Sequence, residues 1–338
     1  MNKKRVLAML LAGAMALSMT ACGGNSASTD GSSNDGGASA SGGSYKVSVI
    51  LKTLAAEYWQ YVKSGAEDYA SEHSDKVTVE VKGPSSETAF DEMQNMIETD
   101  LSSGSYDGIV ISQLQSDTAA QLVSGTKLPI VAIDTNFTAP EVKSFVGTGN
   151  EAAAKKGGEA AVEAAKAAGW TDIKCIEIAG VQGDQTNTAR MNGYKAGVEE
   201  AGGTFLSDEV QYADATADRA TTAMEAIMQT HPEGIAIICA NNDDMAMAAA
   251  RAAQGHDAYK NTIFLGFNGD RAACEAILAG QMTMSVAQMA YEMGYKAVET
   301  MVQVLDGETV DEFVDSGSDV VTPDNAQERL DTLKTQLH

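Results

Sequence analysis

From Tyr45 onward, the sequence alternates short apolar runs of β-strand character with longer segments of helical periodicity. The first run, 45–52, has apolar residues at Val47, Val49 and Leu51, and a helical pattern begins within a few residues of its end. This alternation is typical of βαβ units, in which parallel strands form one sheet and helices cover its faces. The pattern therefore predicts an α/β fold with mostly parallel strands.

The same pattern can be followed to the end of the chain. Strands are expected at 45–52, 76–82, 107–112, 129–133, 144–148, 173–179, 204–211, 234–239, 262–267 and 282–287, with short runs at 311–315 and 318–321. Helices are expected at 57–72, 87–102, 115–124, 150–168, 186–201, 217–229, 243–253, 270–279 and 290–305. The rest of the chain beyond residue 315 is predicted to be a polar tail.

Roughly 290 residues of this kind exceed one typical α/β domain, so we expect two doubly wound parallel-sheet lobes. The first lobe is predicted to contain 44–147 and 289–315, and the second 148–288 and 316–338. Because no proline- or glycine-rich linker separates them, the lobes are expected to be joined by three ordered crossings that form a hinge. These crossings are placed near Gly147–Asn150, Gln288 and Asp315.

The N-terminus has the layout of a secretory signal: three cationic residues, an apolar run and short residues before Cys22. Residues 1–21 are the predicted signal peptide, and 22–43 form a Gly/Ser tract expected to be a flexible tether. The sequence Met19-Thr20-Ala21-Cys22 resembles the lipobox of bacterial lipoproteins, which implies lipidation of Cys22 and anchoring to the cell membrane. The alternative is an ordinary secretory signal with a chance cysteine.

The net charge of the chain limits which molecules it can bind. The chain has 23 cationic and 47 acidic side chains, a net charge of −24, and removal of 1–21 leaves 20 cationic side chains and a charge of −27. Such a chain repels nucleic acid, so phosphate-backbone binding is excluded.

The other three cysteines are Cys175, Cys239 and Cys274, and the four histidines show no metal-binding spacing. Cys175 and Cys239 fall in apolar β-runs, where a free cysteine behaves as a small hydrophobe. We therefore expect no disulfide framework, metal or cofactor.

Polar and aromatic side chains stand just beyond the expected carboxyl ends of the strands, where open α/β sheets bind ligands. They combine amides, one carboxylate, one fixed positive charge and two aromatic rings, a set that suits a neutral polyhydroxylated ligand. Each sugar hydroxyl both donates and accepts, and the sugar ring presents C–H faces that pack on aromatic rings. The candidate ligand-binding residues are Tyr58, Trp59, Asp134, Arg190, Asn242, Asn268 and Gln288.

Each candidate also has a structural explanation. Asn242 and Asn268 precede helical patterns, where N-caps belong. Asp134 could begin an Asx-turn, and Trp59 lies at helical spacing from Val62 and other core positions, so it could be core. Their joint placement at strand ends of both lobes favours a ligand site.

Several phrases of the sequence carry a resemblance to a known family. They are TLAAEYWQYVKSGAE, LPIVAIDTN, TARMNGYKAG, HPEGIAIICANNDDMAMAA, TIFLGFNGD and SVAQMAYEMGYKAVE. In this order they resemble the ribose/galactose-type sugar-binding proteins of bacterial ABC importers, which have the type I periplasmic-binding-protein fold. The resemblance covers about Lys46 to Leu330 and implies a Venus-flytrap protein that binds sugar between its lobes.

Carried over by position, the resemblance implies that Tyr58 and Trp59 stack on the sugar and that Asp134 and Arg190 bind its hydroxyls from opposite lobes. Asn242, Asn268 and Gln288 complete the polar set. The chain departs from the ribose binders at other positions. Asn268 replaces a carboxylate, Thr135 an arginine, Ala56 an asparagine and Ala215 an aromatic residue.

The implied function is capture of a pentose or hexose outside the cytoplasm and its delivery, through lobe closure, to an ABC permease by a monomeric, membrane-anchored protein. The alternatives are a binding protein that feeds a sensor kinase or chemoreceptor, and a binder of another polyol or small metabolite.

Two enzymatic interpretations are less favoured. A dinucleotide site at GTGNEAA, residues 147–153, falls after the fifth strand, where a lobe crossing with a glycine turn is expected. A glycosidase using Asp134 with Asp184 or Asp243 would need two catalytic carboxylates, but amides surround these positions. We therefore expect a protein without enzymatic activity.

Overall fold

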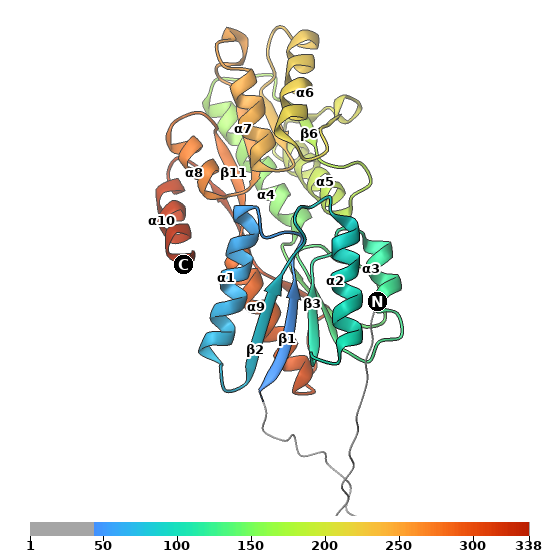
Figure 1. The fold of residues 1–338 in the computed structure, drawn as a ribbon. Coiled ribbons are helices and arrows are strands. Elements are labelled where there is room, and N and C mark those ends of the chain that lie inside the picture. Colours follow the sequence, from blue (N-terminus) through green and yellow to red (C-terminus); the bar gives the residue numbers. More distant parts are fainter. Residues whose placement is uncertain (1–43, 338) are drawn as a thin grey trace, which may run out of the picture. The chain divides into compact units, whose positions relative to one another are not determined.

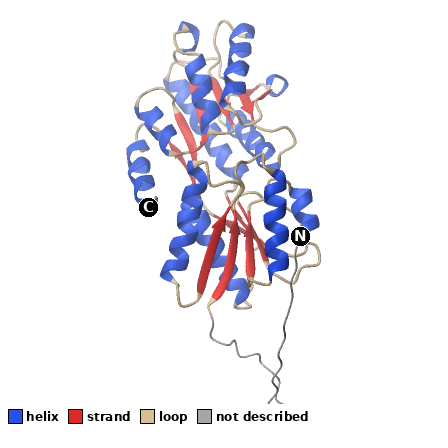
Figure 2. Ribbon diagram, viewed as in Figure 1, coloured by secondary structure: helices blue, strands red, loops and turns tan. Residues whose placement is uncertain are grey.

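The computed structural model describes residues 44–337. The predicted signal peptide, Cys22 and the predicted tether up to residue 43 lie outside the described residues. Figure 1 shows two groups of strands, and Figure 2 shows helices on both sides of each group.

The first sheet has the strand order β12-β5-β4-β3-β1-β2, and every neighbouring pair is parallel. Its strands are β1 (Tyr45–Ile50), β2 (Val77–Lys82), β3 (Gly108–Ile111), β4 (Ile130–Ile133), β5 (Val142–Gly147) and β12 (Phe313–Asp315). Since all six point the same way, their carboxyl ends, and the loops that follow them, meet at one edge.

The second sheet has the order β13-β11-β10-β9-β6-β7, with β8 also paired to β6. Its strands are β6 (Lys174–Ala179), β7 (Thr204–Phe205), β8 (Gln211–Tyr212), β9 (Ile237–Ala240), β10 (Ile263–Asn268), β11 (Met284–Gln288) and β13 (Ser318–Val321). All pairs are parallel except β13, which runs antiparallel to β11.

The helices of residues 44–337 alternate with these strands. They are α1 (Glu57–Glu72), α2 (Phe90–Ser103), α3 (Ser116–Val123), α4 (Asn150–Ala167), α5 (Gln185–Glu200), α6 (Ala217–Thr230), α7 (Asp243–Ala252), α8 (Arg271–Leu278), α9 (Ala290–Leu305) and α10 (Ala326–Gln336), with short 3₁₀ turns η1 (Ser207–Glu209) and η2 (Asp257–Tyr259). None of these helices has the combined length and apolar character that crossing a membrane requires.

The chain passes between the two sheets three times. It leaves the first sheet after β5, returns after β11 as α9, and leaves again between β12 and β13. Buried polar groups join two of these passages: the Thr148 and Ser316 hydroxyls lie 3.4 Å apart, and the Ser316 N–H donates to Gly147 O. The predicted fold class, two parallel-sheet lobes joined by a three-crossing hinge, is confirmed.

Two helix pairs pack with their backbones in contact. A Cβ placed on Gly65 of α1 would lie 1.9 Å from Tyr291 O, and one on Gly294 of α9 would lie 1.9 Å from Val62 O. Gly193 and Gly197 of α5 face the backbone of α4 in the same way. Glycine is therefore required at both helix–helix contacts, because any side chain would push the two helices apart.

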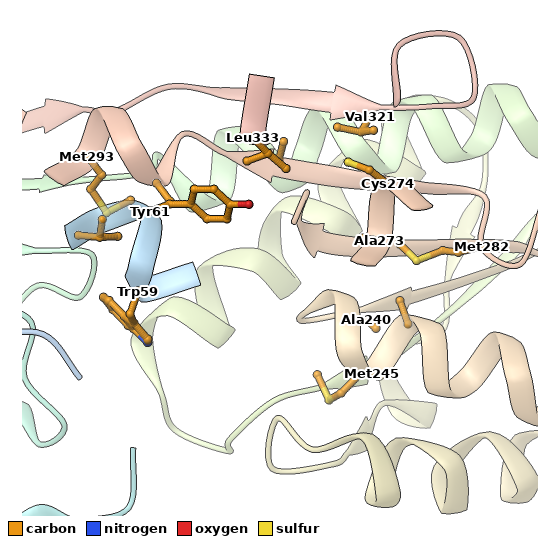
Figure 3. Close-up of a cluster of buried hydrophobic side chains, with 14 of the residues drawn as sticks. Trp59, Tyr61, Ala240, Met245, Ala273, Cys274, Met282, Met293, Val321 and Leu333 are labelled. Atoms are coloured by element: carbon orange, nitrogen blue, oxygen red, sulfur yellow. The ribbon is translucent and has the colours of Figure 1, made fainter. Parts of the chain in front are cut away.

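The largest apolar cluster includes side chains from both halves of the chain. Figure 3 shows Trp59 and Tyr61 projecting from α1 in different directions, with Tyr61 pointing towards Leu333 of α10. Cys175 and Cys239 lie in a second cluster, fully buried on the neighbouring strands β6 and β9, with their Sγ atoms 3.3 Å apart. They occupy core positions, as the apolar runs around them predict.

The predicted polar tail is wrong in part, because residues 326–336 form α10. Ala326, Leu330 and Leu333 are buried at helical spacing, but their neighbours are polar enough to hide this stripe in the sequence. The single strand predicted at 204–211 is also wrong: it is divided into β7, η1 and β8.

The contact between α1 and α9 gives a first prediction. Gly65→Ala and Gly294→Ala should each lower the free energy of unfolding by roughly 1–3 kcal/mol, because the new methyl group must push two helix backbones apart. The measurement is urea unfolding of residues 44–338. Ser71→Ala, at an exposed position of α1, is the control and should change stability by less than about 0.5 kcal/mol. Wild-type stability in both glycine variants would contradict the close packing.

Candidate functional site

Asp134 follows β4 at the carboxyl edge of the first sheet. Its Oδ1 accepts a 2.8 Å hydrogen bond from the Tyr58 hydroxyl, and its Oδ2 accepts a 2.7 Å bond from the Thr135 hydroxyl. Lys52 Nζ lies 3.6 Å from Oδ2. Asp134 has a φ of 63°, in the left-handed region that Asp and Asn tolerate better than most residues. The turn therefore holds a carboxylate whose two oxygens are both oriented.

Tyr58 and Trp59 begin α1 and have different environments. The ring of Tyr58 is partly buried and meets the Trp59 ring edge-on, with 5.0 Å between centroids. Trp59 is only 3% exposed and its Nε1–H donates to Glu87 Oε1 at 2.7 Å. Trp59 therefore belongs to the apolar cluster, its role in ligand binding stays a prediction, and Tyr58 donates its hydroxyl hydrogen to Asp134.

Arg190 lies on α5 in the second lobe and is buried. Its guanidinium stacks on the Phe267 ring, 3.8 Å from the centroid. Nε donates to Asn150 Oδ1 and Nη1 to Asn241 O, each at 2.8 Å. Within residues 44–337, only two of its three nitrogens are paired, so Nη2 is left for another acceptor.

The charges of the two lobes act on one another. Burial lowers the pKa of Arg190, and the negative charge of Asp134 opposes that fall. Burial also raises the pKa of Tyr58 well above its ordinary value, Asp134 adds to the rise, and Arg190 opposes it. The ionisation of Tyr58 and Asp134 in the first lobe is thus electrostatically coupled to the charge of Arg190 in the second.

Asn268 and Gln288 end the neighbouring strands β10 and β11. Gln288 Nε2 donates to Asn268 Oδ1 at 2.9 Å. Asn268 has a φ of 136°, a strained conformation for a residue with a side chain. Arg329 of α10 fixes the same strand ends, because its guanidinium donates to Gly269 O and Gln288 O.

Asn242 serves as a helix cap. Its Oδ1 accepts the Met245 N–H of α7 at 2.9 Å, and its Nδ2 donates to Ala215 O. Asp270, and not Asn268, caps α8 by accepting the Ala273 N–H. A ligand role for Asn242 stays a prediction, and its amide is already engaged in local bonds.

No predicted ligand-binding residue lines the cavity of about 630 Å³ between α7, α8 and the segment 254–262. In the part of the chain that the structure describes, no three His, Cys, Asp or Glu side chains are grouped so as to hold a metal ion.

The sequence and fold can now be compared with known proteins. A model of the periplasmic binding protein domain matches residues 47–309. The D-allose-binding periplasmic protein of Escherichia coli (strain K12) is 30% identical over 264 residues, which cover 75% of this chain and 82% of that protein. The chain belongs to the periplasmic binding protein family.

Two further comparisons agree with this assignment. The ribose import binding protein of Escherichia coli (strain K12) is 27% identical over 268 residues, covering 78% of this chain and 86% of that protein. A carbohydrate transporter solute-binding protein from Agrobacterium radiobacter, solved in complex with D-arabinose, has a TM-score of 0.75 at 24% identity, covering 87% of this chain and 99% of that one. The last likeness concerns the fold alone.

This periplasmic binding protein also contains a buried acid that sequence analysis missed. Glu177 of β6 is fully buried, and neither of its carboxyl oxygens has a hydrogen-bond partner within 44–337. Burial raises its pKa to about 8, although the Asn241 amide and the charge of Arg190 oppose the rise. While its carboxyl group is neutral, Glu177 does not compensate the positive charge of Arg190.

Sequence analysis also missed Lys52, Asn150 and Asn241, which hold the predicted residues in place. Lys52 lies two residues after β1 and Asn241 directly after β9, so their positions near strand ends were available as a signal. Asn150 contacts Arg190 across 40 positions of sequence, and no local pattern reports such a contact. Glu177 was visible as the one charged residue inside the apolar run CIEIAG.

Glu177 gives a prediction about pH. The pKa of Glu177 is about 8 in the folded protein and about 4.3 in an unfolded chain, so the folded state holds the proton more tightly. This group therefore lowers stability as pH rises from about 4.3 to about 8. Glu177→Gln should become progressively more stable than wild type over that range, reaching a difference of a few kcal/mol by pH 8.

The measurement is urea unfolding at several pH values between 4.5 and 8.5. Glu225→Gln, an exposed change in α6, is the control, and its difference from wild type should stay nearly constant because water solvates that carboxyl group. If the Glu177→Gln difference is equally constant, Glu177 is not a neutral buried acid.

Proposed function

We propose that this protein captures a neutral monosaccharide between its lobes, outside the cytoplasm, and delivers it to an ABC permease. The relatives named above support this, since they are D-allose and ribose binding proteins by name. The observation that carries the proposal is that the Tyr58-bonded carboxylate of Asp134 in one lobe interacts electrostatically with the buried guanidinium of Arg190 in the other. A carboxylate and a guanidinium together satisfy a hydroxyl group that both donates and accepts.

Charge supports a neutral ligand. The acidic side chains Asp134, Glu87 and Glu57 lie around the start of α1, and Lys52 is already paired with Asp134. Arg190 keeps only part of its donor capacity. A sugar phosphate or sugar acid would therefore meet more repulsion than attraction here.

The proposed ligand set is that of the sequence: Tyr58, Trp59, Asp134, Arg190, Asn242, Asn268 and Gln288. Within it we place most weight on Tyr58, Asp134 and Arg190, whose charges influence one another, and on the strained Asn268 beside Gln288. A stacking role for Trp59 requires that ligand binding expose a ring face that is buried here. We also propose that the protein is a monomer and has no enzymatic activity.

Asp184 and Asp243, the two residues considered as catalytic partners of Asp134, make other hydrogen bonds. Asp184 caps α5 by accepting the Asn187 N–H, and Asp243 is fully buried and accepts the Ser285 hydroxyl and the Gly269 N–H. These bonds favour a structural role for both carboxylates. Neither of the two carboxylates considered as a catalytic partner of Asp134 is therefore free for glycoside hydrolysis.

We expect a thermal-shift panel of pentoses, hexoses, inositols and disaccharides to yield at least one stabilising neutral sugar. A ligand at 100 times its Kd adds about 2.7 kcal/mol to stability, which is easily measured. The purified domain from residue 44 should bind one molecule by calorimetry and release no product. Stabilisation only by a cationic or carboxylate metabolite would overturn the sugar assignment.

The same experiment can test the site. Asp134→Asn keeps the side-chain shape and tolerates the positive φ but removes the charge, so affinity for the best sugar should fall roughly 10- to 100-fold. Asp75→Asn, an exposed change after α1, is the matched control and should bind like wild type. Unchanged binding by Asp134→Asn would exclude that carboxylate from the site.

We also propose that Cys22 is lipidated and holds the mature protein at the outer face of the cell membrane. A cell expressing the full chain should carry it in the membrane fraction, with an acylated N-terminal peptide by mass spectrometry. Cys22→Ser should abolish acylation and release the protein, whereas Ser26→Ala in the same tract should not. Equal membrane association of the Cys22→Ser protein would support the ordinary secretory signal instead.

A further inference from the structure

One ion pair joins the two lobes directly. Arg271 Nε lies 3.1 Å from Glu57 Oε1, and its Nη2 lies 3.3 Å from Glu57 Oε2. Glu57 is the first residue of α1 in the first lobe, and Arg271 is the first residue of α8 in the second. The two carboxylate oxygens thus face two nitrogens of one guanidinium, the geometry of the stronger ion pairs.

Helix stability does not explain why an arginine begins α8. A helix N-terminus carries partial positive charge, so a cation there is unfavourable and an anion favourable. Asp270 already caps α8, and Glu57 is the only side chain in residues 44–337 that pairs with Arg271. The position of Arg271 is therefore best explained by its contact with the other lobe.

Glu57 is held ready for this contact. Its Oε1 also accepts a 2.8 Å hydrogen bond from Tyr61, one turn further along α1. The Glu57 carboxylate also acts on Asp270 of the second lobe. Burial raises the pKa of Asp270 to about 6, and the carboxylates of Asp244 and Glu57 add to the rise. Separation of the lobes would break the pair and leave Arg271 beside its unfavourable helix terminus.

We propose that the Glu57–Arg271 pair is a latch that stabilises the closed arrangement of the lobes and thereby raises ligand affinity. The proposal rests on the proposed function only for its effect on affinity. The pair is about half exposed, with side-chain accessibilities of 33% and 47%, so the latch is weak and salt weakens it further. A weak latch changes the ratio of closed to open protein several-fold and leaves the ligand to complete closure.

The test is a charge swap. Glu57→Arg and Arg271→Glu should each open the ligand-free domain, seen as a larger radius of gyration by small-angle X-ray scattering at low salt. The double variant Glu57→Arg/Arg271→Glu should restore the wild-type radius, because it rebuilds the pair in reverse and places an acid at the start of α8. Arg251→Glu, at an exposed arginine of α7 that pairs with no acid within 44–337, makes the same charge change and should leave the radius unchanged.

Affinity is measured by calorimetry with D-allose and D-ribose at low salt and in 0.5 M NaCl. Each single variant should bind roughly 2- to 10-fold more weakly at low salt, the double variant should recover, and high salt should reduce the differences. Single variants with wild-type radius, or a double variant no better than the singles, would overturn the latch. If neither sugar binds the wild type, the scattering experiment still decides the latch, and only the choice of sugar has failed.

Discussion

The buried charge of Arg190 sets the strictest requirement in this protein. A guanidinium removed from water must be hydrogen-bonded and its charge compensated, because otherwise its burial lowers the stability of the fold by several kcal/mol. Three elements of the second lobe supply its contacts: Asn150 at the start of α4, Asn241 after β9 and the ring of Phe267 in β10. The compensating charge comes from Asp134 of the first lobe. The arrangement of the lobes and the character of the site therefore depend on one another.

Much of the fold could be predicted because its information is local. The helix expected at 57–72 is α1 residue for residue, and Asp134 directly follows β4 as expected. Gln288 is the last residue of β11, one position from the expected strand end. The helix α10 was missed for a physical reason. The apolar stripe of α10 consists of Ala326, Leu330 and Leu333 among polar neighbours, and only packing against the rest of the protein makes it a helix.

The candidate site could be predicted by residue type but not by partner. Tyr58 and Asp134 were both expected at the site, but the hydrogen bond between them and the place of Lys52 beside the same carboxylate were not. Such contacts join positions 76 or more residues apart, and they depend on strand register and lobe orientation, which periodicity does not report. The strand-end pattern indicated a site for a neutral polar ligand, and the importer function came from the resemblance of the sequence phrases to a known family. The energetic roles of individual side chains required coordinates.

The glycine contacts between α1 and α9 have a mechanical consequence. Since α9 begins two residues after the end of β11, it is the continuation of one crossing, and its backbone touches that of α1, which carries Glu57 and Tyr58 at its start. No layer of deformable side chains separates the two helices at Gly65 and Gly294. Neither helix can shift against the other at these glycines without opening a gap or a clash between backbones, so the position of α1 is mechanically tied to that of the crossing.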